Sequence, residues 1–374
     1  MQYEYFATVA RGLEEMLAEE LQELGAPTTA TDFTGVHFEG DLSLLYRVNL
    51  WSRLAFRILR KIAVVKSNNP DQLYDSVKTV DWSLYLSPEQ TFLVNCTGKN
   101  PRLNHSHFTA LQIKQAIVDQ QQENQRPRSN IDTQNPDIII NAHIHENQCI
   151  LSLDSTGESL HRRGYRSAMG RAPIKETLAS AIIKMSNWTP DLPFFDPLCG
   201  SGTLPLEATL IALNIAPGLY RRGFAFQQWA DYDADLWEKM FREAETQEKD
   251  LQPLIMGSDA DEDVILQAKN NARACGFADK IKFSQQRLAD IEAPADHGIL
   301  ICNPPYGKRL GDTEQLIPLY KMLGDVMKQR FRGWTAYILS GNKELTKKVG
   351  LRTSARIPID NGGIPCTLLK YELY

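Results

Sequence analysis

The sequence of 374 residues lacks long apolar runs and a leader of the kind that directs secretion. No stretch approaches the roughly 18 to 20 uninterrupted apolar residues that a membrane-spanning helix needs. The N-terminal stretch MQYEYFATVARGLEE also lacks the basic-then-apolar order of a secretion signal. We therefore expect a protein that does not enter a membrane and that works in the cytoplasm.

The chain also has few of the patterns that hold disulfides or metals. Its 6 cysteines are scattered, and no two of them form a Cys-x-x-Cys pair, which disfavours both a disulfide framework and a cysteine zinc site. Two His-x-His pairs occur, His105 with His107 and His143 with His145, but no acidic or thiol partner recurs near them. We therefore expect no metal site and a reducing compartment.

No excess of one charge marks the chain as a nucleic-acid binder. It has 41 Lys and Arg against 46 Asp and Glu, a formal net charge of −5. An argument for nucleic acid must therefore be local rather than based on bulk charge. With 43% apolar and 23% charged residues, the composition is that of a folded globular protein, and the length predicts two or three domains.

The first half alternates short strand and helix patterns, which predicts a compact α+β region. An alternating strand from Tyr3 to Val9 leads into a helical pattern over 12–24, which Gly25 ends. A longer helical pattern follows from Leu44 to Ile62. Four basic residues share one face of this expected helix: Arg53, Arg57, Arg60 and Lys61. That face is either solvated or in contact with RNA phosphates, and the sequence leaves both alternatives open.

A hinge between the two halves is expected after a strand that ends at Asp154. Four arginines crowd this junction: Arg162, Arg163, Arg166 and Arg171. Such a junction is a reasonable place for a basic cleft between domains, although linker arginines are often only solvated.

The second half alternates strands with helices, which predicts right-handed βαβ units and a mostly parallel sheet covered by helices. Seven strands are expected, at residues 192–196, 254–259, 281–284, 298–302, 334–340, 352–359 and 366–373. Only the turn NGGIP separates the last two, and it is too short for a crossover helix, so they must pair as a hairpin. An antiparallel strand at the end of such a sheet is unusual for a nicotinamide-binding domain.

Three loops at the carboxyl ends of these strands, where such sheets bind ligands, together predict a nucleoside site. In DPLCGSGT, Gly200 and Gly202 let the backbone pass close to a ligand before a helix begins. Asp259 ends the second strand and can accept both ribose hydroxyls. Asp290 follows the third strand and can accept from an adenine amino group. Any one of these loops suits a helix cap equally well, so only their joint occurrence favours the nucleoside.

The loop after the fourth strand, NPPYGKRLG, is the most specific pattern in the sequence. Two successive prolines stiffen the chain, which directs the Asn303 side-chain oxygen and the Pro304 carbonyl into the cleft beside the ring of Tyr306. Two acceptors beside a stacking ring suit a flat base with an exocyclic amine, because each N–H can donate to one acceptor. Holding both protons directs the nitrogen lone pair at an electrophile. The alternative is an Asn-Pro turn followed by a core tyrosine.

The motifs DPLCGSGT, GSDA, LAD and NPPY, in this order, resemble those of class I S-adenosylmethionine-dependent methyltransferases that modify exocyclic amino groups. The N-terminal half, with FATVARGLEEMLAEELQELGA and LSLDSTGESLHRRGYR, resembles the ferredoxin-like plus THUMP RNA-binding region of bacterial 23S rRNA guanine-N2 methyltransferases. The resemblance implies an α/β fold with a seven-stranded Rossmann-like sheet behind an N-terminal α+β region. It implies three domains: a ferredoxin-like region (1–60), a THUMP domain (61–160) and a methyltransferase domain (161–374).

The resemblance also implies a cofactor, S-adenosylmethionine, and a role for each residue of the motifs. Five residues would hold the cofactor: Asp196, Gly200 and Gly202 its methionine portion, Asp259 its ribose and Asp290 its adenine. Three would hold the target base: Asn303, Pro304 and Tyr306. No metal is implied, and RNA is the implied partner.

We therefore expect an S-adenosylmethionine-dependent RNA methyltransferase, with guanine N2 of 23S rRNA as the leading substrate. The same chemistry on a tRNA guanine, or on adenine N6 of RNA or DNA, stays open because NPPY accommodates any exocyclic amine. A non-catalytic RNA-binding assembly factor is a third alternative, against which the intact Asn303, Asp259 and glycine loop argue. Some bacterial relatives carry a second methyltransferase module, whereas this sequence ends at Tyr374, so one methylation activity is expected.

The spacing departs from a dinucleotide fold in one segment. Asp259 lies 63 positions after Asp196 (259 − 196), against roughly 20 in a dinucleotide fold. The excess, residues 216–252, carries five aromatic or basic residues: Arg221, Arg222, Phe224, Trp229 and Trp237. A lid, an extra RNA surface and a decoration without function all fit this composition.

Overall fold

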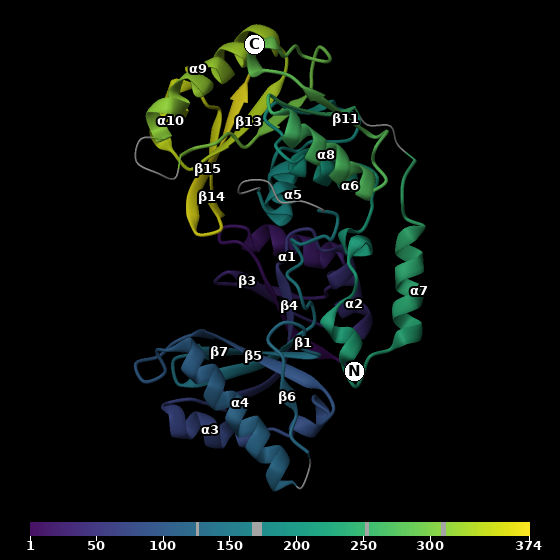
Figure 1. Ribbon diagram of the computed structural model, residues 1–374, viewed down its shortest axis with the longest axis vertical. Coiled ribbons are helices and arrows are strands. Elements are labelled where there is room, and N and C mark those ends of the chain that lie inside the picture. Colours follow the sequence, from purple (N-terminus) through teal and green to yellow (C-terminus); the bar gives the residue numbers. More distant parts are fainter. Residues whose placement is uncertain (125–126, 167–173, 251–253, 308–311) are drawn as a thin grey trace.

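Two β-sheets, one in each half of the chain, organise the protein. In the computed structural model all residues are described except 125–126, 167–173, 251–253 and 308–311. An eight-stranded sheet is built from the first half and a seven-stranded sheet from the second. Figure 1 shows the second half, in green and yellow, above the purple and blue first half. Within the described residues, no helix has the length and apolarity to cross a lipid bilayer.

The first half forms the predicted α+β region around a single sheet with the strand order β2-β3-β1-β4-β8-β7-β5-β6. Its strands are β1 (Tyr3–Thr8), β2 (Thr29–Asp32), β3 (Gly35–Gly40), β4 (Arg57–Lys66), β5 (Thr91–Gly98), β6 (Asn130–Ile131), β7 (Ile138–His145) and β8 (Gln148–Asp154). Its helices are α1 (Glu14–Glu23), α2 (Leu42–Trp51), α3 (Pro70–Lys78), the short turn η1 (Trp82–Leu84) and α4 (Ser106–Glu123). Because β4 pairs with β1 and with β8, the regions expected at 1–60 and 61–160 share one sheet, and the expected boundary lies inside β4.

The helix expected from Leu44 to Ile62 is wrong in its second half. Helix α2 ends at Trp51, Ser52 has an extended backbone (ψ 126°), and β4 begins at Arg57. Ile58 and Leu59 are buried in a strand that has a neighbour on each side. The β-branched residues of β4 favour a strand, and tertiary pairing outweighs the helical spacing of the basic side chains.

The four basic residues expected on that helix therefore form no common face, and each has partners inside the protein. Arg53 donates to the carbonyls of Leu210 and Ile215, at 3.2 and 2.9 Å. The others form ion pairs: Arg57 with Asp154, Arg60 with Asp231, and Lys61 with Glu4. The helix face for which the two alternatives were stated therefore does not form, although Arg57 and Lys61 keep 34% and 35% of their side chains exposed.

The second half contains the predicted seven strands, in the order β11-β10-β9-β12-β13-β15-β14. They are β9 (Phe194–Asp196), β10 (Ile255–Asp259), β11 (Ile281–Gln285), β12 (Ile299–Cys302), β13 (Thr335–Ser340), β14 (Ala355–Asn361) and β15 (Ile364–Glu372). The predicted hairpin is confirmed: β15 is antiparallel to β14 and also to β13. The chain runs outward from β9 through β10 in one direction and from β12 through β13 in the other, so strand order reverses between β9 and β12, where open α/β sheets bind ligands.

Helices cover both faces of this sheet. The helices of the second half are α5 (Glu176–Met185), α6 (Thr203–Ala212), α7 (Ala234–Glu245), α8 (Glu262–Ala274), α9 (Asp312–Arg330) and α10 (Lys343–Lys348), with short turns η2 (Pro217–Tyr220), η3 (Ala225–Gln228) and η4 (Leu288–Asp290). Of these, α7 packs on α2 rather than on the sheet. Along β12, Ile299 and Ile301 pack into the core that includes α5 and α6, whereas Leu300 and Cys302 pack into the core that includes α9. This alternation is the period of two expected for a strand buried on both sides.

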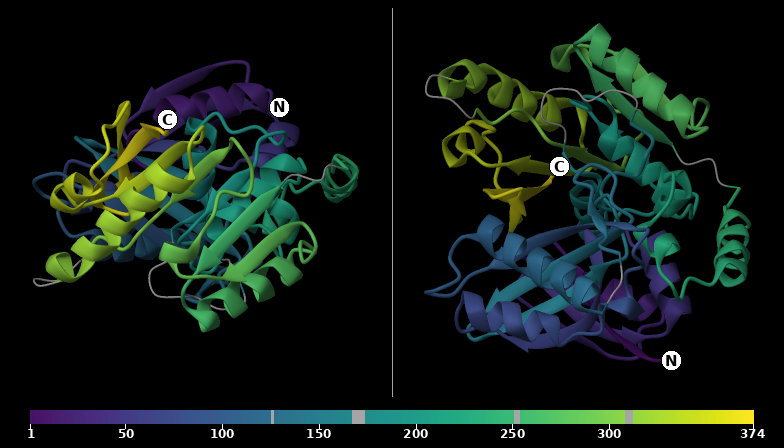
Figure 2. Two further views of the ribbon diagram at one scale, coloured as in Figure 1. Left: turned by 90° about the horizontal axis from the view of Figure 1, so that it is seen from above. Right: turned by 60° about the horizontal axis from the view of Figure 1, so that its bottom comes forward.

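The insertion at 216–252 connects the two halves of the molecule. Trp237 and Phe226 pack on Tyr46 of α2, with ring centroids 5.8 and 4.6 Å apart. The Arg60 guanidinium lies 4.1 Å from the centroid of the Trp229 ring and forms an ion pair with Asp231 at 2.6 Å. Helix α7 lies at the outer side of the molecule in every view (Figure 1, Figure 2).

The junction arginines do not build the expected basic cleft as a group. Arg163 is 1% exposed and pairs with the buried Glu207. Arg162 is exposed and pairs with Glu158, whereas Arg171 lies outside the described residues. Arg163 can be buried because its donors are paired with Glu207, with the Leu160 carbonyl and, across to the first half, with the Arg53 carbonyl.

Candidate functional site

Three predicted site residues lie at the ends of three adjacent strands. Asp196 ends β9, Asp259 ends β10, and Asn303 follows β12. Because β9 lies between β10 and β12 and all three run parallel, their carboxyl ends share one edge of the sheet. The arrangement is also tied together locally, since the Gly200 amide donates to the Asp259 carboxylate at 3.1 Å.

The two glycines of the loop after β9 have different structural roles. Both have positive φ, +54° at Gly200 and +85° at Gly202, a conformation that side chains disfavour. A Cβ on Gly202 would lie 2.8 Å from the Phe283 ring, so close packing there requires glycine. A Cβ on Gly200 would meet no atom of the described residues within 4 Å, so Gly200 leaves space beside the loop.

Asp196 is a buried carboxyl at the centre of the site. It is 2% exposed, and one of its oxygens accepts from the Leu198 amide at 3.1 Å. Burial raises the pKa of Asp196 well above its ordinary value, and the neighbouring Asp259 raises it further. A carboxyl in that state is stabilised by a cation or by additional N–H donors. The ammonium group of the methionine portion of S-adenosylmethionine would supply both, so the residues present fit this group.

Asp290 lies at the same edge of the sheet but is paired within its own turn. It ends η4, which follows β11, and its side chain is 53% exposed. Arg287 Nε donates to its carboxylate at 2.9 Å, and this bond lowers the pKa of Asp290. The adenine role of Asp290 stays a prediction, since an adenine amino group would compete with Arg287 for the carboxylate.

Asn303 carries the most unusual feature of the site. Its side-chain oxygen Oδ1 is buried and has no hydrogen-bond partner among the residues that the structure describes. Leaving such an acceptor unpaired costs about 1–3 kcal/mol, and unpaired groups of this kind in folded proteins call for a reason. A ligand N–H donated at this position would remove the cost. Asn303 therefore meets the requirement for a residue that binds an amino group.

Tyr306 is half-buried, and two asparagines that the sequence did not single out contact it. Asn342 Nδ2 donates to the Tyr306 carbonyl at 3.4 Å, and Asn361 Nδ2 donates to the Tyr306 hydroxyl at 2.9 Å. The sequence indicates only a turn at Asn361, and no spacing rule connects it with a residue 55 positions earlier. Pro304 is buried beside the site. Its ring fixes the backbone angle φ, which stiffens the connection from β12 to Tyr306.

Arg166, which precedes α5, forms an ion pair with Glu176 and a hydrogen bond with Thr203 at the end of the glycine loop, and sequence reasoning missed both contacts. Arg166 Nε lies 2.8 Å from Glu176 Oε1, and Arg166 Nη2 donates to the Thr203 hydroxyl at 2.7 Å. Burial raises the pKa of Glu176 to about 7. The sequence did indicate a helix after Ile174 and an arginine-rich junction before it, but nothing in the pattern indicated that Arg166 of the junction would pair with Glu176 of the helix.

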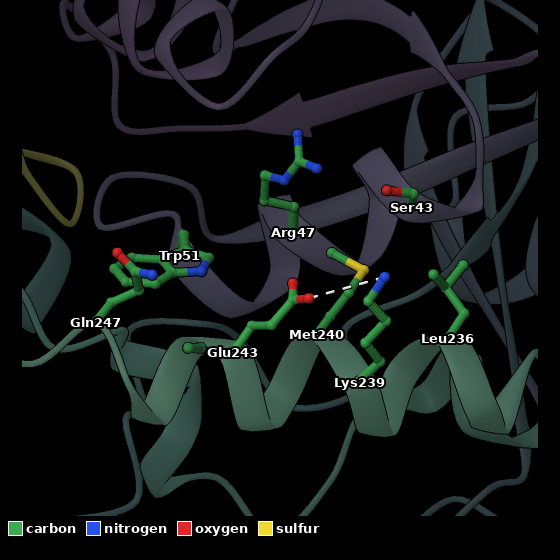
Figure 3. Close-up of a pocket in the computed structure, with 9 residues that line it drawn as sticks. Ser43, Arg47, Trp51, Leu236, Lys239, Met240, Glu243 and Gln247 are labelled. Carbon is green, nitrogen blue, oxygen red and sulfur yellow. Dashed lines mark ion pairs between the residues drawn. The ribbon is translucent and has the colours of Figure 1, made fainter.

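A cavity of about 370 Å³ lies between α2 and α7 (Figure 3). Trp51 and Arg47 line it from α2, and Met240 lines it from α7. An ion pair between Lys239 and Glu243 spans 3.8 Å on the α7 side. None of the predicted site residues lines this cavity, so its size alone does not make it the candidate site. Among the described residues, no cluster of three or more metal-ligating side chains is found.

Family models match three consecutive segments of the chain. The model described as the RMKL-like methyltransferase domain matches residues 163–370. The THUMP domain model matches residues 67–154, and the model described as the RlmL ferredoxin-like domain matches residues 4–59. Together the three models account for nearly all of the chain.

Individual proteins match over the whole chain. A candidate RNA methyltransferase of Synechocystis, slr0064, is 62% identical over 371 residues, which cover 99% of this chain and 97% of the relative. The ribosomal RNA large subunit methyltransferase K/L of Syntrophotalea carbinolica is 41% identical over 99% of this chain. This chain spans only 53% of that relative. The crystal structure of SMU.472, a candidate methyltransferase in complex with SAH, is 33% identical with a TM-score of 0.90, covering 100% of this chain and 98% of SMU.472.

Proposed function

The chain belongs to the family of RMKL-like methyltransferases, which depend on S-adenosylmethionine, and from this premise we propose that it methylates guanine N2 in 23S rRNA. An RNA substrate is supported by the THUMP match and by the names of the relatives. The 23S assignment is supported by the large-subunit K/L relatives. The chain spans about half the length of those relatives, and the proposal concerns only the reaction of the site described above.

The buried, unpaired Oδ1 of Asn303 is the observation that carries the proposal. It lies at the end of β12, next to β9, at the edge of the sheet where Asp196 and the glycine loop gather. An exocyclic amine brings the missing donor to this oxygen. A hydroxyl or ring-nitrogen substrate would bring fewer N–H donors or none.

The residues of the NPPY loop would orient the amine rather than react with it. When bound, S-adenosylmethionine supplies an electrophilic methyl group. Asn303 Oδ1 accepts one N–H and the Pro304 carbonyl accepts the other, which keeps the nitrogen lone pair out of conjugation with the ring. Tyr306 stacks on the base, which must be unpaired or flipped out of a helix to reach the loop. Holding the nitrogen and the methyl group at near-attack distance lowers the barrier to direct methyl transfer, and this positioning supplies a large part of the rate enhancement.

The opposite side of the site would hold the cofactor. Asp196 and the loop from Gly200 to Gly202 lie where the methionine portion is expected, and Asp259 lies where the ribose is expected. The open space beside Gly200 and the raised pKa of Asp196 both support this assignment. Asp290 would contact the adenine once its carboxylate is released from Arg287.

Replacing Asp259 with alanine is expected to weaken S-adenosylmethionine binding roughly 10- to 100-fold, because hydrogen bonds to a charged group contribute about 1.5–3 kcal/mol. The substitution also removes the acceptor of the Gly200 amide. Isothermal titration calorimetry measures the change. Asp261→Ala is the matched control, since Asp261 only caps α8 and should leave the affinity near that of the wild type. Wild-type affinity in Asp259→Ala would remove Asp259 from the ribose site.

The reaction is tested with the purified full chain, S-[methyl-³H]adenosylmethionine and total RNA from a strain that lacks the gene. Digestion and mass spectrometry then identify the labelled nucleoside. We expect N²-methylguanosine in the large-subunit rRNA. Label in N⁶-methyladenosine, or in tRNA, would contradict the substrate assignment, and no label in RNA would contradict the proposed function.

A further inference from the structure

Both ends of Tyr306 are held by asparagine side chains from other elements. Asn342, which follows β13, donates to the Tyr306 carbonyl at 3.4 Å. Asn361, which ends β14, donates to the Tyr306 hydroxyl at 2.9 Å. The first bond restrains the backbone and the second restrains the far end of the ring, so that rotation about the side-chain bonds of Tyr306 requires breaking the second.

Asn361 is itself held in a tight hairpin. Gly362 and Gly363 both have positive φ, 64° and 86°, which is the two-residue turn that matches the twist of a β-hairpin. The Asp360 carboxylate accepts from the Gly363 amide at 2.7 Å and closes the turn. Asn361 pairs with Ile364 in the ladder. The donor to Tyr306 is therefore carried by a rigid element.

The ring has little room to move on the side of β13. A Cβ built on Gly341 would lie 3.1 and 3.2 Å from two ring carbons of Tyr306 and 3.3 Å from Cys366 Sγ. Burial raises the pKa of the Tyr306 hydroxyl, and the neighbouring Cys366 raises it further. The hydroxyl therefore stays protonated near neutral pH and keeps the same hydrogen-bonding role.

We propose that Asn361 is a positioning residue that, through the Tyr306 hydroxyl, fixes the ring on which the target base stacks. The inference rests on the proposed function for the role of the ring. The supporting contacts come from the β13, β14 and β15 side of the sheet, whereas the residues expected to hold the cofactor follow β9, β10 and β11. Loss of Asn361 should therefore disturb the base and leave cofactor binding unchanged.

A double-mutant cycle tests the proposal. Asn361→Ala removes the bond to the Tyr306 hydroxyl, and Tyr306→Phe removes the same bond together with the contact of the hydroxyl with Cys366; each should lower kcat for RNA methylation roughly tenfold, without changing the Kd of S-adenosylmethionine. The double variant should be no slower than either single one. Independent effects would instead multiply to about a hundredfold, which would overturn the proposal, as would a wild-type kcat in Asn361→Ala.

Two further variants separate positioning from general damage to the hairpin. Asp360→Ala removes the bond that closes the turn but keeps the Asn361–Ile364 ladder pair and the donor to Tyr306, so kcat should fall less than in Asn361→Ala; a loss equal to that of Asn361→Ala would overturn the proposal. Gly341→Ala leaves the donor in place but crowds the ring, and displacement by a few tenths of an ångström should lower kcat several-fold. Melting curves confirm that each variant is folded.

A crystal structure of Asn361→Ala tests the role of Asn361 independently of the proposed function, because it shows the position of the Tyr306 ring whether or not the protein methylates RNA. If the wild-type protein binds S-adenosylmethionine but methylates no RNA, the proposed function fails while the ring can still be examined directly. A rotated or disordered Tyr306 ring would support the role of Asn361, and an unchanged ring would overturn it.

Discussion

Replacing Asn303 with alanine is expected to slow methyl transfer by roughly 10²- to 10³-fold, the loss typical of one positioned polar group in a reaction centre. The substitution removes the buried oxygen that has no partner in the described part of the chain and that is proposed to accept an N–H of the base. Binding of S-adenosylmethionine should stay nearly intact, because the residues expected to hold it follow other strands. Single-turnover assays with saturating cofactor measure the chemical step.

Asn303→Asp is the matched control for this prediction. The aspartate keeps an acceptor oxygen at the same position, so this variant should retain more activity than Asn303→Ala. The expected order of rates is therefore wild type, Asn303→Asp and Asn303→Ala. An unchanged rate in Asn303→Ala would refute the assignment of Asn303, and equal losses in the two variants would mean that the acceptor oxygen is not what matters.

Replacing Glu207 with alanine is expected to lower the free energy of unfolding by about 3–5 kcal/mol, because it leaves the buried Arg163 without its counter-charge. Arg163 and Glu207 are 1% and 0% exposed, and their closest side-chain atoms lie 3.2 Å apart. Glu207 also accepts from the Tyr165 hydroxyl at 2.9 Å and from the Ser180 hydroxyl at 2.5 Å. All of these partners would lose an acceptor that water does not replace.

Thermal unfolding followed by circular dichroism measures this loss as a lower midpoint. Glu158→Ala is the matched control, because it removes the exposed ion pair with Arg162, and exposed pairs contribute about 0–1 kcal/mol. We expect a large shift for Glu207→Ala and almost none for Glu158→Ala. Similar midpoints for the two variants would show that the buried pair contributes no more to stability than the exposed pair does.

The seven-stranded sheet was predictable because its signals are local. Each strand is a short apolar run bounded by turn residues, and the turn NGGIP permits only a hairpin between the last two strands. The edge at which the ligand loops gather follows from the rule for parallel sheets, and this rule alone predicts that Asp196, Asp259 and Asn303 lie along one edge. The chemical roles of these residues remain predictions that the variants above test.

The errors arose where distant partners decide the local structure. The basic residues from Arg53 to Lys61 have a helical spacing, yet Arg57 and Arg60 belong to a strand because β1 and β8 pair with it. Their partners, Asp154 and Asp231, are far away in the sequence. In the same way, Asn361 reaches Tyr306 only because β14 and β15 fold back along β13. Spacing alone carries no information on such contacts.

The proposed reaction is tested most directly by mapping methyl groups in the rRNA and tRNA of a strain that lacks the gene. Mass spectrometry should find one N²-methylguanosine missing from 23S rRNA. Expression of the wild-type chain should restore it, and expression of Asn303→Ala at the same level should not. No missing methyl group, or full restoration by Asn303→Ala, would contradict the account.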